Sequence, residues 1–371
     1  MKILLFAASL AVLVVSGLCV NAQEGERLYR IRVQDRYGFI DKTGKVVVEP
    51  QYERAGEFSE GFAWVVAKDG KYGYIDVSGR FAIRPVLGFG EDFSDGLAVA
   101  GVIDVKTGKA TRGYIDKTGK PIFNMGIDPM PFPRPFAEGL AVTFRDGKAG
   151  FMDKAGRMVI EPRFDTAFNF SEGLAQVRID KKYGYIDKGG KMVIEPQFPQ
   201  PTTVDHVGRP HLTDHDRPFR NGLTSIGIGD REWSVIDKTG KIIFSPSPGR
   251  YAPFLFSEGL LRYAEQYNEG FLNPDGSVAV KATWRTVNDF SDGMAAVEGN
   301  DGCPDHLGNC WGFIDKTGAV VIKPQFASAE SFKGGLAQVT TRRTDPKDGR
   351  MFFTVRYIDR GGNFVWSTPA N

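Results

Sequence analysis

The sequence has few of the features that most enzymes and nucleic-acid-binding proteins need. Its 47 Lys and Arg nearly balance its 45 Asp and Glu, for a formal net charge of +2. This balance provides neither the basic surface that binds nucleic acid nor an acidic tail. No glycine-rich phosphate loop of the GxGxxG or GxxxxGK(S/T) type follows a strand. With only four His and three Cys, no Ser/His/Asp or Cys/His arrangement stands out. These absences weigh against nucleic-acid binding and catalysis, and no cofactor is expected.

Long apolar runs are also missing, except at the N-terminus. There Lys2 precedes an unbroken run of apolar or small residues from Ile3 to Val15, and residues 20–22 include the small residues at which signal peptidase cuts. This pattern predicts a signal peptide at residues 1–22 and an exported mature chain, periplasmic or extracellular, with no transmembrane segment. A lipid anchor at Cys19 is the less favoured alternative, because Leu18 is bulkier than the residue that usually precedes a lipidated cysteine.

Cleavage after residue 22 leaves two cysteines, Cys303 and Cys310, in a turn-rich insert at residues 301–310. In an oxidising compartment such an even pair predicts a disulfide, worth at most about 2–3 kcal/mol for so short a loop. A metal site is disfavoured because only His306 lies nearby. Thiol titration of the denatured, unreduced protein is therefore expected to find no free thiol.

Glycine and proline, by contrast, are plentiful, with 45 and 21 copies that suit many short strands and turns. The clearest unit is FSEGLAQVRIDKKYGYIDKGGKMVIEPQF, at residues 170–198. Its alternation predicts strand A at Gly173 to Val177, strand B at Tyr183 to Asp187 and strand C at Lys191 to Glu195. A glycine-containing turn joins B to C, and Pro196 is expected to end strand C. The unit is thus a predicted three-stranded meander followed by a loop.

Parts of this unit recur along the whole chain. The aspartate of the B-to-C turn recurs every 34 to 50 residues, with Asn273 as one substitute, at Asp41, Asp76, Asp116, Asp153, Asp187, Asp237, Asp315 and Asp359. A Phe-x-x-Gly signature precedes strand A eight times, beginning at Phe58, Phe93, Phe136, Phe170, Phe219, Phe256, Phe290 and Phe332. We expect each Phe to be a buried anchor and each aspartate to accept hydrogen bonds from its own turn. Such a period marks a repeat domain of about nine units at residues 23–371.

The two signatures resemble those of the WG repeat family of bacterial proteins, also called KWG repeats. The nearest match to the family motif is WGFIDKTG at residues 311–318, followed by KPQF at residues 323–326. Most other copies replace this Trp by Tyr or a smaller residue. The resemblance implies a β-rich repeat protein of interaction type, and it supplies no catalytic residues.

The predicted fold is all-β, with the meanders stacked in an open, curved or superhelical array. One unit buries about five large apolar side chains worth roughly 1.5–3 kcal/mol each, whereas ordering about 35 residues costs several times more, so neighbours must share a core. A closed, propeller-like ring of eight or nine blades is the alternative. It is disfavoured because propeller blades usually have four strands, and this chain begins with strand A and ends with strand C.

Three inserts interrupt the period, at residues 121–135, 199–218 and 301–310. The first is predicted to be an irregular or polyproline-like connection. The second holds three imidazoles, His206, His211 and His215, beside three carboxylates, and is the one place where a Zn²⁺ site could be argued. Because the spacing matches no known zinc finger and Pro210 prevents a regular helix, a solvated loop is favoured and no metal is assigned. The turn aspartates match neither an aspartic protease nor a Ca²⁺ loop.

The favoured function is an exported, non-catalytic binding or scaffold protein for a protein or glycan partner in the cell envelope. The alternative is a hydrolase or metal-dependent enzyme with its site in the 199–218 insert, whose deletion would abolish activity but leave partner binding largely intact. For a glycan, the recurring aromatics of strand B offer stacking surfaces, namely Tyr37, Tyr72, Tyr183, Trp233 and Trp311. Aromatics that recur at one place in every unit are, however, expected in the core between repeats.

Overall fold

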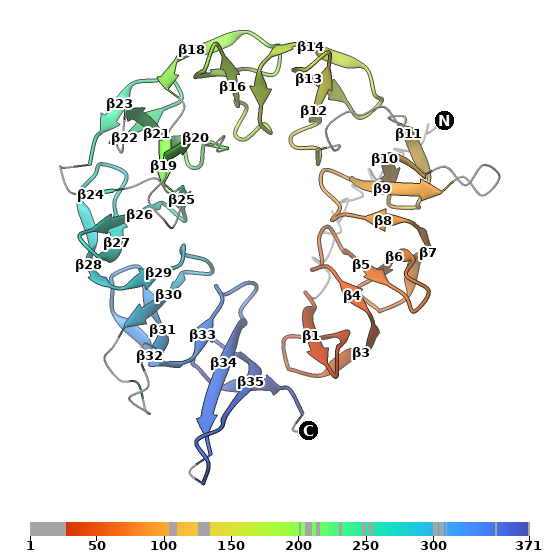
Figure 1. Ribbon diagram of the computed structural model, residues 1–371, viewed down its shortest axis with the longest axis vertical. Coiled ribbons are helices and arrows are strands. Elements are labelled where there is room, and N and C mark those ends of the chain that lie inside the picture. Colours follow the sequence, from red (N-terminus) through yellow and green to blue (C-terminus); the bar gives the residue numbers. More distant parts are fainter. Residues whose placement is uncertain are drawn as a thin grey trace, which may run out of the picture.

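The repeats form nine small sheets arranged around a common axis, so the protein is a nine-bladed β-propeller (Figure 1). The computed structural model describes residues 27–103, 110–124, 134–199, 202–204, 210–212, 216–229, 232–246, 250–251, 255–299, 303, 308, 310–345 and 347–369. These residues form strands and turns but no helix, and so include no helical segment able to span a membrane. The predicted signal peptide at residues 1–22, Cys19 included, lies outside the described residues.

Each blade contains the predicted meander of strands A, B and C. Strand A is β1 (Tyr29–Val33), β5 (Phe62–Val66), β9 (Leu97–Ile103), β12 (Leu140–Arg145), β16 (Ala175–Ile179), β21 (Leu223–Gly229), β26 (Leu260–Glu265), β30 (Met294–Gly299) and β34 (Ala337–Thr344) in blades 1 to 9. Strand B is β2 (Arg36–Ile40), β6 (Tyr72–Asp76), β10 (Ala110–Asp116), β13 (Lys148–Asp153), β17 (Lys182–Ile186), β22 (Glu232–Asp237), β27 (Asn268–Leu272), β31 (Cys310–Asp315) and β35 (Met351–Ile358).

Strand C forms the outer edge of each blade (Figure 1). It is β3 (Val46–Tyr52), β7 (Phe81–Leu87), β11 (Pro121–Asn124), β14 (Met158–Phe164), β18 (Met192–Pro199), β23 (Ile242–Phe244), β28 (Val278–Trp284), β32 (Val320–Phe326) and β36 (Phe364–Ser367). The first predicted insert therefore begins as a regular strand, because residues 121–124 pair with β10. Residues 125–133 lie outside the described part.

A fourth, two-residue strand lies on the inner side of strand A in six blades. These inner strands are β4 (Arg54–Ala55), β8 (Phe89–Gly90), β15 (Thr166–Ala167), β24 (Arg250–Tyr251), β29 (Thr286–Val287) and β33 (Ser328–Ala329). In blade 7 the signature loop adds β25 (Phe256–Ser257), which also pairs with β26. This fourth strand was not predicted, because two residues are too few to show the alternation by which strands are recognised in a sequence.

The closed ring corrects the main prediction, which was an open array, and agrees with the alternative. A ring was disfavoured partly because each predicted unit has three strands. The inner strands give six blades the fourth strand that is usual in propellers. The other reason was that the chain begins with strand A and ends with strand C. No blade is completed from both termini in the described part of the chain, and blade 9 instead packs directly against blade 1.

Strand C is also longer than predicted, because Pro196 does not end it. The pairs Tyr185↔Ile194 and Tyr183↔Phe198 enclose a bulge that contains Pro196, where strand B needs no N–H donor from strand C. Gly184 lies opposite this bulge, and a Cβ placed there would be 2.4 Å from the Ile194 carbonyl oxygen. The glycine of strand B is therefore required by a close approach of backbone.

The core between blades is a chain of aromatic contacts. The aromatic residue that directly follows the strand B glycine packs on the signature Phe of the next blade, with ring centroids 4.5 to 5.0 Å apart in seven blade pairs. Phe332, for example, is fully buried against Phe313. Each blade thus supplies part of the core of the next, and a single blade cannot bury its own anchor.

Blade 1 closes the ring with a different side chain. Tyr29 pairs with Ile40 of strand B, as Ala98 of blade 3 pairs with Ile115. Six of the other blades have Ala at this position of strand A, but blade 1 has Tyr29. The Tyr29 ring contacts Tyr357 of blade 9 at 5.8 Å, and its hydroxyl donates a hydrogen bond to the Gly334 carbonyl. The Tyr357 hydroxyl donates in turn to the Arg30 carbonyl at 2.7 Å. Tyr29 therefore replaces the missing Phe anchor at the seam, which is the interface between blades 9 and 1.

Candidate interaction surface

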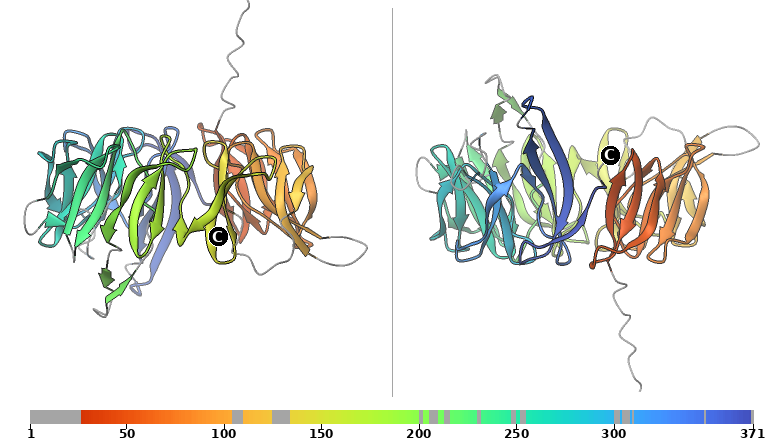
Figure 2. Two further views of the ribbon diagram at one scale, coloured as in Figure 1. Left: turned by 90° about the horizontal axis from the view of Figure 1, so that it is seen from above. Right: turned by 90° about the horizontal axis from the view of Figure 1, so that it is seen from below.

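The antiparallel meander places different connections on the two faces of the ring. The B-to-C turns and the Phe-x-x-Gly loops lie on one face, because both are next to the start of strand A. The A-to-B turns and the ends of strand C lie on the other. We call the first the clasp face and the second the variable face. Figure 2 shows the ring edge-on, with the two faces above and below the blades.

On the clasp face, each turn aspartate accepts hydrogen bonds from its own turn. The Asp41 carboxylate accepts from the amides of Thr43 at 2.8 Å and Lys45 at 3.1 Å, and from the Thr43 hydroxyl at 2.6 Å. The same bonds to the amides two and four residues later recur at Asp76, Asp116, Asp153, Asp187, Asp237, Asp315 and Asp359. The hydroxyl bond holds the pKa of Asp41 below its ordinary value. These carboxylates shape turns.

A second acidic residue joins a blade to the next at six of the interfaces between blades. Glu172 of blade 5 accepts hydrogen bonds from the amides of Asn221 and Gly222 of blade 6, and it pairs with Lys238 at 3.0 Å. We call this arrangement an inter-blade clasp. Burial raises the pKa of Glu172, but these donors outweigh burial and bring it below its ordinary value. Equivalent clasps join Glu60 to Gly96 and Lys117, Asp95 to Gly139 and Lys154, Glu138 to Gly173 and Lys188, and Glu258 to Gly293 and Lys316. Between blades 8 and 9 the Asp292 carboxylate accepts from the Gly335 amide, and Arg360 donates to the Asp292 backbone carbonyl.

The clasp explains why an acidic residue occupies a strained position. Glu172 has a φ of 51°, and the acidic residues of the other clasps have φ between 49° and 58°. This left-handed conformation costs a non-glycine residue roughly 1–2 kcal/mol. Blade 6 has Asn221 there instead, and Pro274 of blade 7 stands where the clasp lysine would be. At the interface between blades 6 and 7, both members of the clasp are therefore replaced.

The variable face differs from blade to blade. Its A-to-B turn is a tight two-residue turn at Gln266 and Tyr267 in blade 7, a disulfide-bounded insert in blade 8 and an extended hairpin in blade 9. The hairpin of β19 (Thr202–Val204) and β20 (Pro210–Leu212) is an additional element, separate from the blades. In Figure 2 this green hairpin and the blue hairpin of blade 9 project from the same side of the ring.

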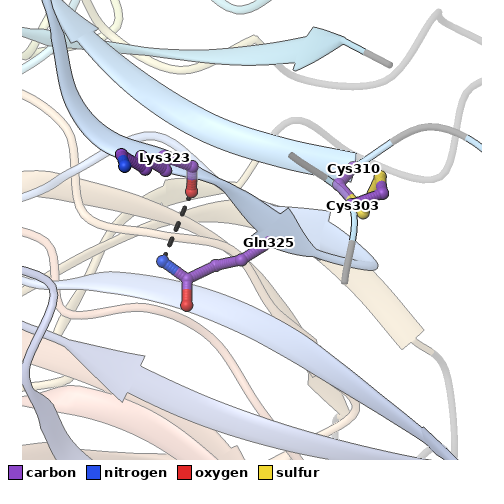
Figure 3. Close-up of a disulfide and its surroundings, with 4 residues drawn as sticks. All are labelled: Cys303, Cys310, Lys323 and Gln325. Atoms are coloured by element: carbon purple, nitrogen blue, oxygen red, sulfur yellow. Dashed lines mark hydrogen bonds between the residues drawn. A yellow bond between two sulfur atoms is a disulfide. The ribbon is translucent and has the colours of Figure 1, made fainter. Parts of the chain in front are cut away.

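The structure locates some of the residues proposed for disulfide and metal sites. Cys303 and Cys310 are joined by a disulfide, with Cα atoms 5.5 Å apart. Figure 3 shows it at the start of β31, beside β32, where the Gln325 amide donates to the Lys323 carbonyl at 3.3 Å. His211 lies in β20, opposite Thr203, whereas His206 and His215 lie outside the described residues. The described residues contain no group of three or more His, Cys, Asp or Glu that could hold a metal ion.

The aromatic residues considered for glycan stacking are divided between core and partial exposure. Tyr183 and Trp233 are buried, whereas Tyr37, Tyr72 and Trp311 are half-buried. All of them except Trp233 pair with a large residue near the end of strand C in the same blade, as Trp311 does with Phe326. Tyr37, Tyr72, Tyr183 and Trp311 also belong to apolar clusters shared with the next blade, as expected for the core between repeats. Tyr37 lines a cleft as well.

That cleft lies at the seam and has a volume of about 240 Å³. Blade 1 contributes Arg30, Ile31, Arg32 and Tyr37, and blade 9 contributes Gln338, Val355, Tyr357 and Trp366. The guanidinium groups of Arg30 and Arg32 lie 5.5 and 5.6 Å from the centroid of the Tyr37 ring. Three successive β1 residues line the cleft together with residues of β2, β34, β35 and β36, so the cleft lies between blades 1 and 9 and beside β1. In the described part of the chain no inner strand pairs with the inner edge of β1.

A second hollow lies at the inner edge of blades 2 and 3. It has a volume of about 490 Å³ and is lined by Ser59, Trp64, Gly90, Glu91, Asp92, Phe93, Ser94 and Pro135. Its residues belong to the regular inner connections, including Ser59, whose hydroxyl donates to the Phe93 carbonyl at 2.7 Å. The same bond joins Ser94 to Phe136 and Ser171 to Phe219. This hollow is therefore part of the repeated scaffold, whereas the seam cleft occurs where the repeat pattern is broken.

Comparison with known proteins identifies the repeat. The family model described as "WG containing repeat" matches residues 37–72, 72–102, 150–183, 183–200, 270–302 and 311–342. The chain belongs to the WG repeat family. The six matches are spread from blade 1 to blade 9. A match such as residues 37–72 begins in strand B of one blade and ends at strand B of the next, so the WG repeat is offset from the blade and links two neighbouring blades. No curated protein sequence matches the chain.

Two solved structures are similar to the chain at low sequence identity. One described as a eukaryotic initiation factor is 10% identical, with a TM-score of 0.57, and the match covers 92% of this chain and 96% of that one. BamB from Moraxella catarrhalis is 11% identical, with a TM-score of 0.46, and the match covers 89% and 98% of the two chains. The first likeness concerns the fold alone.

The sequence analysis did not single out the seam cleft or the clasps. A signal for both was present. For the clasps, the signal is the acidic residue that precedes the signature glycine in six blades, and both the acid and the lysine are replaced at Asn221 and Pro274. Tyr29 stands where most copies have Ala, which marks blade 1 as a different neighbour for blade 9.

Proposed function

We propose that this WG repeat protein is an exported, non-catalytic binding module of the cell envelope that takes up an extended segment of a protein partner at the seam. A propeller built from such repeats is typical of binding and scaffold proteins, and a strand can be added to an open sheet edge. The observation that carries the proposal is the inner edge of β1: no inner strand pairs with it among the described residues, and β1 itself lines the seam cleft.

The repeat register supports an open edge in the mature protein. In five blades the inner strand pairs with a residue ten positions later, as in Ala55↔Val65, Gly90↔Ala100, Ala167↔Val177, Val287↔Val297 and Ala329↔Val339. Ile31 is the equivalent of Val65, since both pair with the glycine of strand B. The equivalent inner residue would be Asn21, within the segment that signal peptidase is predicted to remove. Removal of the signal peptide would therefore leave the inner edge of β1 open to a strand from another chain.

The backbone of β1 presents groups that could bind such a strand. In blade 2 the carbonyls of Trp64 and Val66 accept hydrogen bonds from the inner segment, from Gly56 at 2.9 Å and Glu53 at 3.0 Å. The equivalent residues of blade 1 are Arg30 and Arg32. The Arg30 carbonyl already accepts from Tyr357. The peptide groups of Arg32 point away from β2, because Arg32 and Tyr37 form a non-hydrogen-bonded pair of the ladder. Arg32 is thus the natural anchor for an added strand.

The lining of the cleft indicates what kind of segment would fit. A volume of about 240 Å³ is small for a drug-sized ligand but suits a few side chains of a peptide. The Arg30 and Arg32 guanidinium groups beside the Tyr37 ring, together with Trp366 in the lining, favour a segment that carries an acidic side chain next to an apolar or aromatic one. Arg30 also pairs with Glu57 at 3.2 Å, and Arg32 with Asp35 at 2.6 Å, so a ligand carboxylate would compete with these partly exposed pairs.

The experiment compares Arg32→Pro with Arg32→Ala in the purified mature protein. Proline removes the outward N–H and is tolerated at a sheet edge, whereas alanine removes only the side chain. In pull-downs from envelope extract with quantitative mass spectrometry, we expect the partners retained by wild type to fall about five- to tenfold for Arg32→Pro, and less for Arg32→Ala. Equal melting temperatures would show that both variants are folded. Undiminished capture by folded Arg32→Pro would contradict strand addition.

A further inference from the structure

The hairpin of blade 9 is longer than its counterparts. In blade 5 the last pair before the A-to-B turn is Ile179↔Lys182, and the equivalent pair in blade 9 is Thr341↔Thr354. Three further pairs follow, Arg342↔Phe353, Arg343↔Phe352 and Thr344↔Met351. This extension carries the hairpin beyond the variable face, as the blue strands in Figure 2 show. It lengthens a blade that is already complete.

The extension exposes large apolar side chains on both of its faces. Met351, Phe352 and Phe353 are 52%, 46% and 60% exposed. Successive residues of a strand point to opposite sides, so Phe352 lies on one face and Met351 and Phe353 on the other. A groove on a partner protein would cover one face and leave the other in water. A fluid apolar medium can surround both.

The charges around the tip fit a negatively charged surface. Residues 342–351 include the cations Arg342, Arg343, Lys347 and Arg350 but only two carboxylates, those of Asp345 and Asp348. Asp348 pairs with Arg350 at 2.6 Å, and the Arg343 guanidinium lies over the Phe352 ring at 5.6 Å. Basic residues beside exposed aromatics are the composition by which peripheral elements bind anionic membranes.

The backbone of the tip is suited to entering an apolar layer. The eight pairs of the hairpin and the turn bonds from Asp345 to Arg350 at 2.7 Å and from Gly349 to Asp345 at 2.9 Å use the polar groups internally. Unsatisfied backbone groups are what prevents most loops from entering lipid. We propose that this hairpin docks on an anionic lipid bilayer. Met351, Phe352 and Phe353 enter the boundary between headgroups and acyl chains, and the flanking Arg and Lys residues contact the headgroups.

The test is co-sedimentation of the mature protein with phosphatidylcholine vesicles that contain about 30% phosphatidylglycerol. Wild type is expected to sediment with these vesicles, and more weakly at high salt or with phosphatidylcholine alone. Replacing Met351, Phe352 and Phe353 together by Ser is expected to lower the partition coefficient about tenfold or more. Arg343→Glu combined with Lys347→Glu is expected to abolish the preference for anionic vesicles.

Two control variants show whether membrane binding belongs to the hairpin alone. Tyr267→Ser removes a 94% exposed aromatic from the same face and is expected to leave sedimentation unchanged. Arg32→Pro is also expected to sediment like wild type, because the seam is a different site. The proposal is overturned if wild type does not sediment above the vesicle-free background, or if the triple Ser variant sediments equally. It is also overturned if the triple variant loses only proteins captured from extract, which would make the hairpin a protein-docking element.

Discussion

The clasp face and the variable face of the ring are built from the same repeat but follow different rules. On the clasp face, six acidic residues adopt the same left-handed conformation and hold the next blade by the same contacts. On the variable face, blades 7, 8 and 9 carry a tight turn, a disulfide-bounded insert and an apolar hairpin. Repetition thus indicates which contacts hold the ring together, and departures from repetition indicate where a partner could bind.

The largest expected contrast is between two phenylalanines of blade 9. Phe332 is fully buried against Phe313, whereas Phe353 is 60% exposed on the variable face. Phe332→Ala is expected to lower the free energy of unfolding by about 3–5 kcal/mol through the cavity it leaves. Phe353→Ala is expected to change it by no more than about 0.5 kcal/mol. Denaturant unfolding of both variants measures the contrast, and similar losses would break the comparison.

A second contrast is between two glycines. A Cβ on Gly184 would meet the backbone of strand C at 2.4 Å, whereas at Gly229 the nearest atom is the end of the flexible Glu232 side chain at 3.1 Å. Gly184→Ala is expected to cost about 1–3 kcal/mol, because the bulge must open to admit the methyl group. Gly229→Ala is expected to be nearly neutral. Thermal unfolding of the two variants is the measurement, and a neutral Gly184→Ala would mean that the bulge can move.

The clasps give a smaller effect that can be tested in both directions. Glu172→Gln weakens the hold on Lys238 and is expected to cost about 1 kcal/mol or less, since both side chains are about one-third exposed or more. Asn221→Glu with Pro274→Lys would install the missing clasp between blades 6 and 7. The pair together should be more stable than the sum of the single changes, as measured by a double-mutant cycle. Additive single changes would contradict a contact between the two positions.

The repeats explain how much of this architecture could be predicted. The number of units, strands B and C and the turn aspartates were readable because they recur with strong signals such as Asp-Lys-Thr-Gly. The inner strands were not, since pairs such as Thr166 and Ala167 show no periodicity of their own. Ring closure depends on Tyr29 and Tyr357, whose contact joins residues far apart in sequence. The seam cleft forms only where blades 1 and 9 meet, so it could not be located from the sequence.

The smallest expected effect concerns acid stability on the clasp face. Hydroxyl bonds lower the pKa of Asp41, Asp116, Asp237 and Asp315 in the folded protein. A folded-state pKa below the unfolded value stabilises the protein above about pH 4, and this contribution is lost as pH falls through the folded pKa. Thr43→Val removes the main donor to Asp41 and should slightly flatten the fall in melting temperature below pH 4. An unchanged profile would mean that the hydroxyl contributes nothing.

Closure of the ring at the seam is the claim on which both faces depend. It can be measured directly with spin labels on cysteines that replace Lys42 and Arg360, which lie in the B-to-C turns of blades 1 and 9; the paired native cysteines would not react. Double electron–electron resonance should give a single short distance, as expected for turns of neighbouring blades. A long or broad distribution would show that blades 1 and 9 are apart, and would contradict the closed propeller.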